Sequence, residues 1–152
     1  MKKYILYIFM LLVILFNGCT RTHVNVKPLK VNKNNIDTIC IQENKKVLDT
    51  EFLIIMQDEF LKRAINTKIY REKLPDSCEY ELYYTANSRW DLHYYLKNAS
   101  LQIRHNGKII ASVNYEGPSG LNSYKRQSTR TKLIPVFDTL LSKYNKLLNN
   151  GE

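Results

Sequence analysis

Few side chains in this sequence combine the types and the spacing that catalysis or metal binding requires. Asp91 and His93 are two residues apart, so on a strand they would share one face and lie within reach of an ion pair. A pair of this kind is more often structural than catalytic. The other histidines, His23 and His105, are distant along the chain, and the sequence contains no nucleophile elbow, phosphate-binding loop or zinc-ligand spacing. We therefore expect a protein that is not an enzyme and that binds no metal and no cofactor.

Tyrosines form a second group of candidate residues, because each brings a large contact area and a polar hydroxyl group. Two adjacent pairs, Tyr83-Tyr84 and Tyr94-Tyr95, lie in strand-like segments. Successive side chains of a strand point to opposite faces of the sheet, so each pair has one core member and one surface member. Tyr83 and Tyr95 are our candidates for a ligand or partner surface. The alternative is that all four tyrosines serve ordinary sheet packing.

A basic cluster precedes the last helix-like segment of the chain. It consists of Lys125, Arg126, Arg130 and Lys132. Such a cluster can contact lipid head groups or other polyanions of a cell envelope. The alternative is a solvated loop. We add Lys125, Arg126 and Arg130 to the candidate partner surface.

The N-terminal segment predicts where the chain is sent. Two lysines follow Met1, an unbroken apolar run covers residues 4–16, and Gly18-Cys19 closes the segment. This order is typical of a secretory signal peptide, which we assign to residues 1–18. A transmembrane helix is the alternative, but it needs about 20 apolar residues, and this run has 13.

Gly18-Cys19 resembles the lipobox of bacterial lipoproteins, although Phe16 and Asn17 depart from its usual leucine and small residue. The resemblance implies that the Cys19 thiol is acylated with chains such as palmitate, and that the mature chain is anchored to a membrane without spanning it. Thr20 follows the cysteine, whereas an aspartate at this place retains lipoproteins of enteric bacteria in the inner membrane. The resemblance therefore implies an outer-membrane protein that faces the periplasm.

Two cysteines, Cys40 and Cys78, remain once Cys19 is acylated. The exported side of a membrane is oxidising, so a leftover pair is expected to be bridged. We predict a disulfide between them. The alternative is two buried thiols that pack as small hydrophobic groups.

Length and charge are those of one small basic domain. Without the signal peptide the chain has 134 residues, of which 21 are basic and 14 acidic, a net charge of +7. That charge would suit nucleic acid, but export from the cytoplasm argues against such a partner. Residues 19–35 are predicted to be the lipidated N-terminus and an extended tether, followed by a single domain over 36–149. An edge strand built from Val24, Val26 and Val31 is the less favoured alternative for the tether.

The apolar periodicity predicts an α+β domain. Residues 36–42 have apolar side chains on both faces, which is typical of a central strand, and residues 50–65 form an amphipathic helix. A second helix is predicted between Thr131, its possible cap, and Leu148. Further strand-like runs cover residues 67–70, 79–84, 94–104 and 108–115. These elements predict an antiparallel sheet of four to five strands with two helices packed on one face.

Asn106-Gly107 predicts a hairpin between the last two strands. A two-residue loop would set the apolar residues of the two strands on opposite faces. A three-residue loop over 105–107 pairs Ile103 with Ile109 and keeps them on one face. We therefore predict the three-residue loop.

The tyrosine-rich segment 78–86, followed by Trp90-Asp91, resembles small uncharacterised lipoproteins of the proteobacterial envelope. The resemblance covers roughly residues 36–148 and implies an α+β envelope domain with no known reaction. We expect a membrane-anchored, periplasm-facing interaction or assembly module that is bound to membrane lipid through Cys19 and to an envelope protein. The alternative is a lipoprotein that binds a lipid or small ligand on the open face of the sheet.

Overall fold

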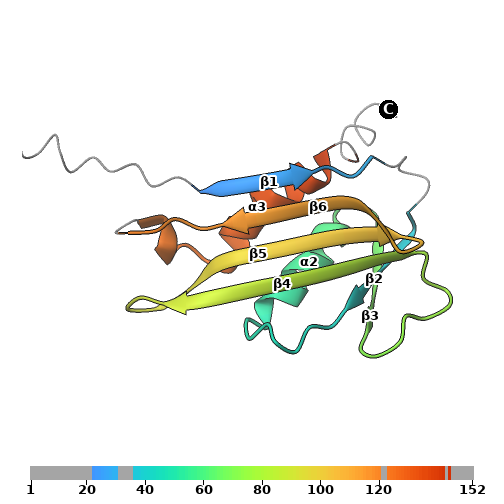
Figure 1. The fold of residues 1–152 in the computed structure, drawn as a ribbon, viewed down its shortest axis with the longest axis horizontal. Helices are drawn as coiled ribbons and strands as arrows, with labels where there is room; N and C mark the ends of the chain where they lie inside the picture. The colour runs from blue at the N-terminus through green and yellow to red at the C-terminus, as the bar shows by residue number, and fades with distance from the viewer. Residues whose placement is uncertain (1–21, 31–35, 121–122, 143, 145–152) are drawn as a thin grey trace, which may run out of the picture.

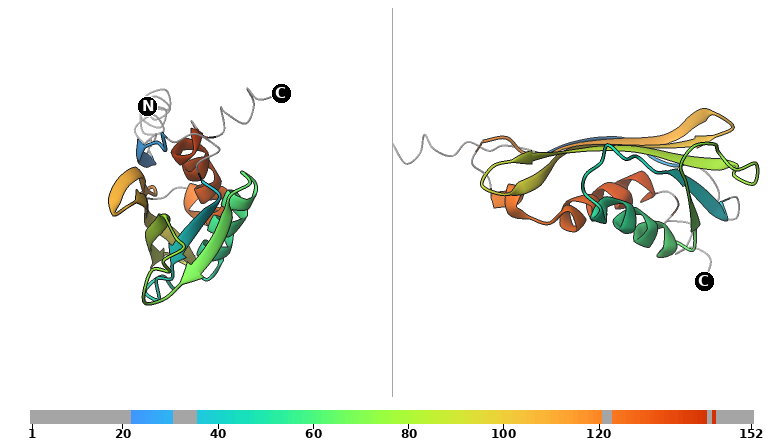
Figure 2. Two further views of the ribbon diagram at one scale, coloured as in Figure 1. Left: turned by 90° about the vertical axis from the view of Figure 1, so that its right-hand side faces the viewer. Right: turned by 90° about the horizontal axis from the view of Figure 1, so that it is seen from below.

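The chain folds into two layers, a sheet of six strands and a layer of two helices on one of its faces (Figures 1 and 2). The structure is a computed structural model that describes residues 22–30, 36–120, 123–142 and 144. It confirms the α+β class with two packed helices. The sheet has more strands than predicted, and it is mixed, where the sequence predicted a purely antiparallel sheet.

The elements follow one another in a simple order along the chain. The strands are β1 (His23–Lys27), β2 (Thr38–Gln42), β3 (Asn66–Tyr70), β4 (Tyr80–Trp90), β5 (Tyr94–His105) and β6 (Lys108–Glu116). The helical elements are α2 (Glu51–Leu61), the short 3-10 helix η2 (Ser123–Arg126) and α3 (Thr129–Leu140). In space the strands are ordered β1-β6-β5-β4-β2-β3.

Strand β2 is parallel to both of its neighbours, β3 and β4. Helix α2 joins β2 to β3, and a helical crossover returns the chain to the edge of the sheet at which β2 began, so β3 runs in the same direction. The antiparallel prediction is therefore wrong at this edge. The prediction of a central strand is confirmed, because Ile39, Cys40 and Ile41 of β2 are all fully buried.

Strand β1 extends the opposite edge of the sheet. It pairs antiparallel with β6, with His23 opposite Glu116 and Val26 opposite Val113. The strand lies within residues 19–35, for which the sequence favoured an extended tether. Residues 23–27, which include Val24 and Val26, instead form an edge strand, the less favoured alternative, whereas its third residue, Val31, lies outside the described residues.

The β5–β6 hairpin has a two-residue loop, and the predicted three-residue loop over 105–107 is wrong. His105 pairs with Lys108, which leaves Asn106 and Gly107 as the turn. Their φ angles are 50° and 73°. Positive φ at both positions is the geometry of a type I′ turn, which an Asn-Gly pair favours.

A bulge in β6 places the apolar residues of β5 and β6 on the same face of the sheet. The sequence had predicted that a longer loop would do this. Arg104 pairs with Ile109, whereas Ile103 pairs with Ala111, so Ile110 is an extra residue in the ladder. One extra residue moves every later side chain of β6 to the other face. The apolar sets of β5 and β6 therefore meet, as the prediction required, but they do so through the bulge.

The N-terminus of α3 differs slightly from its prediction. The cap is Ser128 and not Thr131: the Ser128 hydroxyl oxygen accepts a hydrogen bond from the Thr131 backbone N–H at 3.2 Å. Because the helix starts earlier than expected, Pro135 lies inside it. The Thr139 hydroxyl donates to the Pro135 carbonyl oxygen at 2.7 Å, one turn further along.

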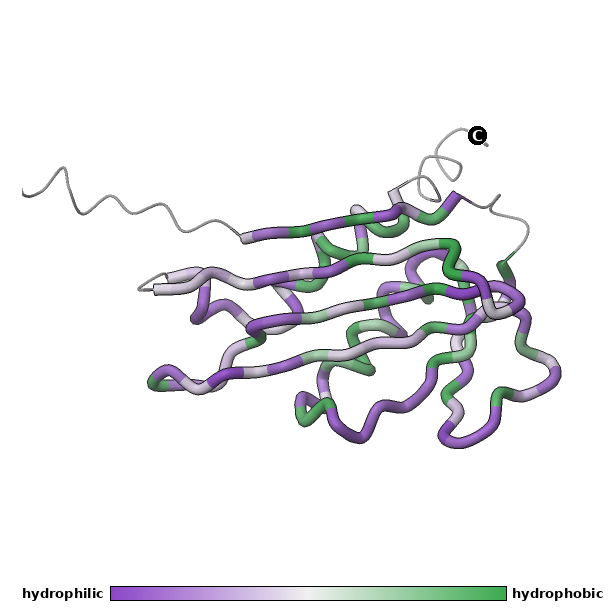
Figure 3. The backbone as a smooth tube through the Cα atoms, in the orientation of Figure 1, coloured by the Kyte–Doolittle hydropathy of each residue, from purple (hydrophilic) through white to green (hydrophobic). Residues whose placement is uncertain are grey.

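The main core fills the space between the helices and the sheet. Phe60 of α2 meets Phe137 of α3 edge to face, with ring centroids 5.7 Å apart, and Phe52 stacks on Tyr84 of β4 at 5.5 Å. Figure 3 shows apolar stretches in the helices and, alternating with polar ones, in the strands. In the described part of the chain, no helix has the length and hydrophobicity needed to cross a bilayer.

Candidate functional site

Most of the candidate residues lie at the end of the sheet where β4 turns into β5. We call this region, residues 86–97 together with 123–132, the hairpin end. It lies at the left of Figure 1, with η2 and the start of α3 beside it. Strand β1 begins at the same end, because His23 is opposite Glu116, the last residue of β6.

Asp91 and His93 lie in the turn itself and do not share a strand face as the sequence suggested. The Asp91 backbone N–H donates to the His93 carbonyl oxygen at 3.0 Å, which closes the turn. Lys125 Nζ donates to the Asp91 carboxylate at 2.7 Å, and His93 Nε2 lies 3.3 Å from the Lys125 carbonyl oxygen. Both side chains therefore attach η2 to the hairpin.

The charges at this contact reinforce each other. The hydrogen bond from Lys125 lowers the pKa of the Asp91 carboxyl, and the same bond raises the pKa of the Lys125 ammonium. Both groups are therefore charged at neutral pH. Among the described residues, no three His, Cys, Asp or Glu side chains are grouped so that they could hold a metal ion.

Tyr95 is packed among cations and offers little free surface. Its exposed fraction is 8%, and the Nζ atoms of Lys125 and Lys132 lie 5.3 and 5.6 Å from its ring centroid. Lys132 is 1% exposed and donates to the Lys125 carbonyl oxygen at 2.9 Å. Burial lowers the pKa of Lys132. Lys132 was predicted to be part of the basic cluster, and no pattern in the sequence indicated that its charge is buried.

Tyr83 lies on the open face of the sheet, toward the middle of β4. The guanidinium carbon of Arg104 is 4.2 Å from its ring centroid. Tyr83 pairs with Gln102, whereas Tyr95 pairs with Arg89, so the two tyrosines are six residues apart along β4. The structure does not bring the two candidate tyrosines into one site.

The three basic candidates are also separated. Lys125 is buried and bound to Asp91, whereas Arg126 is exposed. Arg130, in the first turn of α3, lies 2.8 Å from the Asp58 carboxylate of α2. Of the predicted basic surface, Arg126 is exposed at the hairpin end, whereas Arg130 is half-buried and paired with Asp58.

Cys40 and Cys78 form the predicted disulfide, which is confirmed. Their Cα atoms are 6.0 Å apart, and both residues are buried. With Tyr70 and the partly buried Leu74 they form a small second cluster apart from the main core. The disulfide thereby fixes the loop before β4 to the sheet. Cys19, the predicted lipidation site, lies outside the described residues.

Three large exposed side chains at the hairpin end were not among the predicted site residues. Trp90, Leu92 and Tyr94 are 65%, 81% and 78% exposed. Figure 3 shows an apolar segment at this turn between polar ones. Their alternation resembles one face of a continuous strand, so the available signal indicated the wrong structure.

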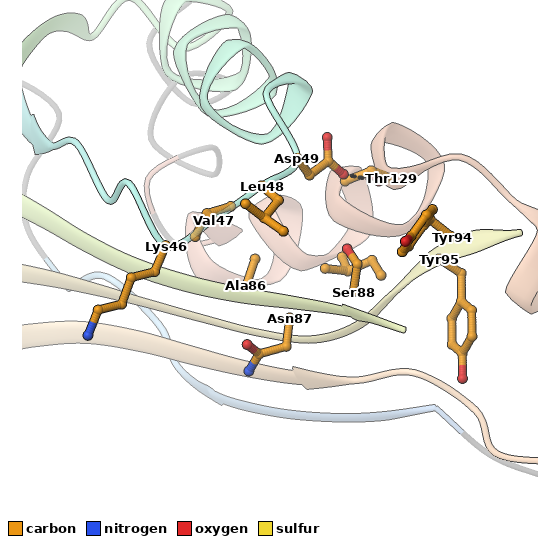
Figure 4. Close-up of a pocket in the computed structure, with 11 residues that line it drawn as sticks. Lys46, Val47, Leu48, Asp49, Ala86, Asn87, Ser88, Tyr94, Tyr95 and Thr129 are labelled. Atoms are coloured by element: carbon orange, nitrogen blue, oxygen red, sulfur yellow. Dashed lines mark hydrogen bonds between the residues drawn. The ribbon is translucent and has the colours of Figure 1, made fainter. Parts of the chain in front are cut away.

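A cavity of about 590 Å³ opens beside the same turn, between the segment before α2 and the ends of β4 and β5 (Figure 4). Thr129 Oγ1 donates to the Asp49 carboxylate at 2.6 Å and closes one side. The Tyr94 ring turns toward Thr129, whereas the Tyr95 ring points away from it. The apolar part of the lining comes from Val47, Leu48, Ala86 and Leu96.

Solved structures share the fold of this chain at low sequence identity. No protein family and no curated protein matches the sequence. A variant of the PelC dodecamer from Paraburkholderia phytofirmans matches with a TM-score of 0.51 and 14% sequence identity. The match covers 76% of this chain and 97% of the PelC chain. A second crystal form of PelC gives 0.50 and 12% over the same shares. A PDZ domain protein from Parabacteroides distasonis gives 0.44 and 11%, over 84% of this chain and 38% of that one. The likeness to PelC shows the fold alone, a two-layer α+β domain.

Proposed function

We propose that this chain is an outer-membrane lipoprotein that faces the periplasm and works as a non-enzymatic interaction or assembly module. The observation that carries the proposal is the Cys40–Cys78 disulfide, in a chain whose apolar N-terminal run ends at Gly18-Cys19. Structural disulfides persist in oxidising compartments such as the periplasm, and a signal peptide directs a chain there. Cys19 is the one cysteine outside that bond.

The geometry of the hairpin end supports a module without catalysis. Asp91 and His93 were the best catalytic pair in the sequence. Both are engaged with Lys125, one through its carboxylate and the other through its ring nitrogen. Their contacts hold η2 in place, which is a structural task.

The fold supports an assembly role. PelC, which has this fold, is a dodecamer, so the fold is compatible with association between copies. An open sheet also leaves unpaired backbone groups along the outer sides of its two edge strands, here β1 and β3. We include self-association and binding of another envelope protein in the proposed role.

Replacing Cys19 by serine is expected to abolish lipidation, because the acyl chain is attached to the thiol. The full-length chain would be expressed in a Gram-negative host fed an alkyne-tagged palmitate. The wild type is expected to carry the tag and to sediment with the outer membrane. Cys19→Ser is expected to carry none and to remain uncleaved or soluble.

A matched control is available at the next residue. Thr20→Asp keeps the thiol, so it should keep the tag but move to the inner-membrane fraction. Unchanged labelling of Cys19→Ser, or an unlabelled wild type, would contradict the lipoprotein proposal.

Binding of a lipid or small ligand is a second candidate function, and the cavity beside Tyr94 favours it. The cavity lies on the helix side of the sheet, not on the open face where the sequence suggested a binding site. A cavity of about 590 Å³ is within the range of small-molecule sites, roughly 300–1,000 Å³.

Filling the cavity is expected to remove any such ligand. Native mass spectrometry of the full-length protein, extracted in mild detergent, should show a bound species that Ala86→Phe lacks. The Ala86 side chain borders the cavity in Figure 4, so a phenyl ring would take up part of its volume. A ligand-free wild type, or equal binding by a folded Ala86→Phe variant, would exclude this function.

A further inference from the structure

The hairpin tip, which we define as Trp90, Leu92 and Tyr94, exposes three large side chains on one turn. Their exposed fractions range from 65% to 81%. Leu48, which is 89% exposed, lines the same cavity as Tyr94 and extends the apolar character of this end. Scattered exposed apolar residues need no explanation, but a group of them at a protruding point marks a contact surface.

The backbone conformation of Leu92 suggests that its side chain is needed for a contact. Leu92 has φ 62°, in the left-handed region that glycine and asparagine occupy at lower cost. The turn would form more readily with either of those residues. Strained positions of this kind often coincide with functional sites, where the side chain is needed for a contact.

Sheet register places the start of β1, the strand that follows the expected lipid anchor in sequence, at the same end of the sheet as the tip. His23 is opposite Glu116, and Glu116 is opposite Asn98, four residues from Tyr94 along β5. Cys19 is four residues before His23, and four residues of fully extended chain reach at most about 14 Å. Strand β1 runs away from the hairpin end, so its N-terminal side faces the same direction as the tip (Figure 1).

The charges at this end suit a bilayer surface. Arg89 and Arg126 are exposed next to the tip, and the carboxylate of Asp91 is compensated by Lys125. Basic side chains are attracted to anionic lipid head groups. Tryptophan and tyrosine concentrate at membrane interfaces, where an apolar ring and a polar group are both accommodated.

We propose that the hairpin tip inserts into the interfacial region of the same bilayer that holds the acyl chains of Cys19. The inference rests on the proposed lipid anchor and adds a second contact to it. With two contacts at one end of the sheet, the strands point away from the membrane. The β5–β6 hairpin and β3 are then presented to the periplasm.

Trp90 allows a direct test, because it is the only tryptophan in the chain. The mature acylated protein would be reconstituted into vesicles of phosphatidylethanolamine and phosphatidylglycerol. Trp90 emission is expected to shift to shorter wavelength relative to the acyl-free Cys19→Ser protein in buffer. Lipids with brominated acyl chains are expected to quench it.

Two variants separate tip insertion from anchoring. Leu92→Asn suits the left-handed backbone, so it should fold, and it is expected to lose part of the blue shift and of the quenching. Leu61→Asn is the matched control, because Leu61 is 67% exposed at the end of α2, close to the start of β3 and away from the tip. It should behave as the wild type.

The outcomes distinguish the two proposals. A protein that carries the acyl tag and floats with the vesicles, but whose Trp90 emission is neither shifted nor quenched, keeps its anchor and overturns the tip proposal. That result is also expected if the tip binds a partner protein and not lipid. A chain that carries no acyl tag overturns the proposed anchor, and the tip proposal with it.

Discussion

Replacing Cys40 and Cys78 together by alanine is expected to lower the free energy of unfolding by about 4 kcal/mol. The disulfide joins residues 38 positions apart, and in the chain-entropy model, closing a loop of that length stabilises by roughly this amount. It is a large share of the ~5–15 kcal/mol that holds a domain together. The melting temperature should fall by about 10–20 °C. Thermal unfolding of the mature domain, followed by circular dichroism, measures both quantities.

Reductant provides the control for this prediction. Cys40 is fully buried and Cys78 is 8% exposed, so dithiothreitol should reduce the bond slowly in the folded protein and quickly once it unfolds. Reductant present during unfolding should therefore lower the wild-type melting temperature and leave that of the double variant unchanged. Mass spectrometry of unreduced protein from the periplasm should find the two peptides linked. Free thiols at both positions would contradict the prediction.

Features decided by local pattern could be predicted from the sequence. Ile39 and Ile41 on one face of a short run, with Cys40 on the other, indicated a strand covered on both sides, and β2 is such a strand. The disulfide was predicted from the expected oxidising compartment and from the number of cysteines, and it is present. Both helices were found because the apolar stripe that packs on the sheet repeats with the helical period.

Features decided by distant contacts could not be predicted in the same way. The alternation of Trp90, Leu92 and Tyr94 is that of a strand, and a positive φ at Leu92 interrupts it although leucine is a poor turn residue. In the turn, Asp91 is bound by Lys125 of η2, more than thirty residues later in the sequence. No local pattern encodes that contact.

The hairpin register shows a third kind of limit. The apolar residues of β5 and β6 do share one face, as predicted. Two structures can achieve this, a longer loop or a bulge in one strand. Asn106-Gly107 is so well suited to a two-residue turn that the extra residue is placed at Ile110 instead. The three-residue loop was predicted on the assumption that only the loop length of the hairpin can vary.

Buried charges between the helices lead to the second large effect. Glu59 is 1% exposed and accepts hydrogen bonds from Lys62 at 2.6 Å and from Arg63 at 2.8 Å. Arg63, itself 6% exposed, also binds the Asp138 carboxylate of α3. Arg63 therefore joins the end of α2 to α3 while it compensates the buried carboxylate.

Arg63→Met is expected to destabilise the domain by about 3–5 kcal/mol, because removing one partner leaves a buried charge poorly compensated. Lys62→Met removes the other partner of the same carboxylate, but the Lys62 side chain is 57% exposed. Its loss should cost about 1 kcal/mol or less. Urea unfolding of the two variants measures the difference. Equal effects would show that Arg63 adds nothing beyond an exposed ion pair.

The pH dependence identifies the cause of the loss at Arg63. Burial, the largest single influence, raises the pKa of Glu59, but the hydrogen bonds and the positive charges of Lys62 and Arg63 together outweigh it and lower the pKa from its ordinary 4.5. A carboxyl group with a lowered pKa stabilises the folded state above that value, and the stabilisation is lost as the pH falls through the folded-state pKa. Without Arg63 the pKa of Glu59 should rise, since burial then has less opposition. The cost of Arg63→Met should therefore be greatest at neutral pH and should shrink as Glu59 becomes protonated on acidification. A cost that stays constant with pH would instead indicate that lost packing of the arginine side chain is responsible.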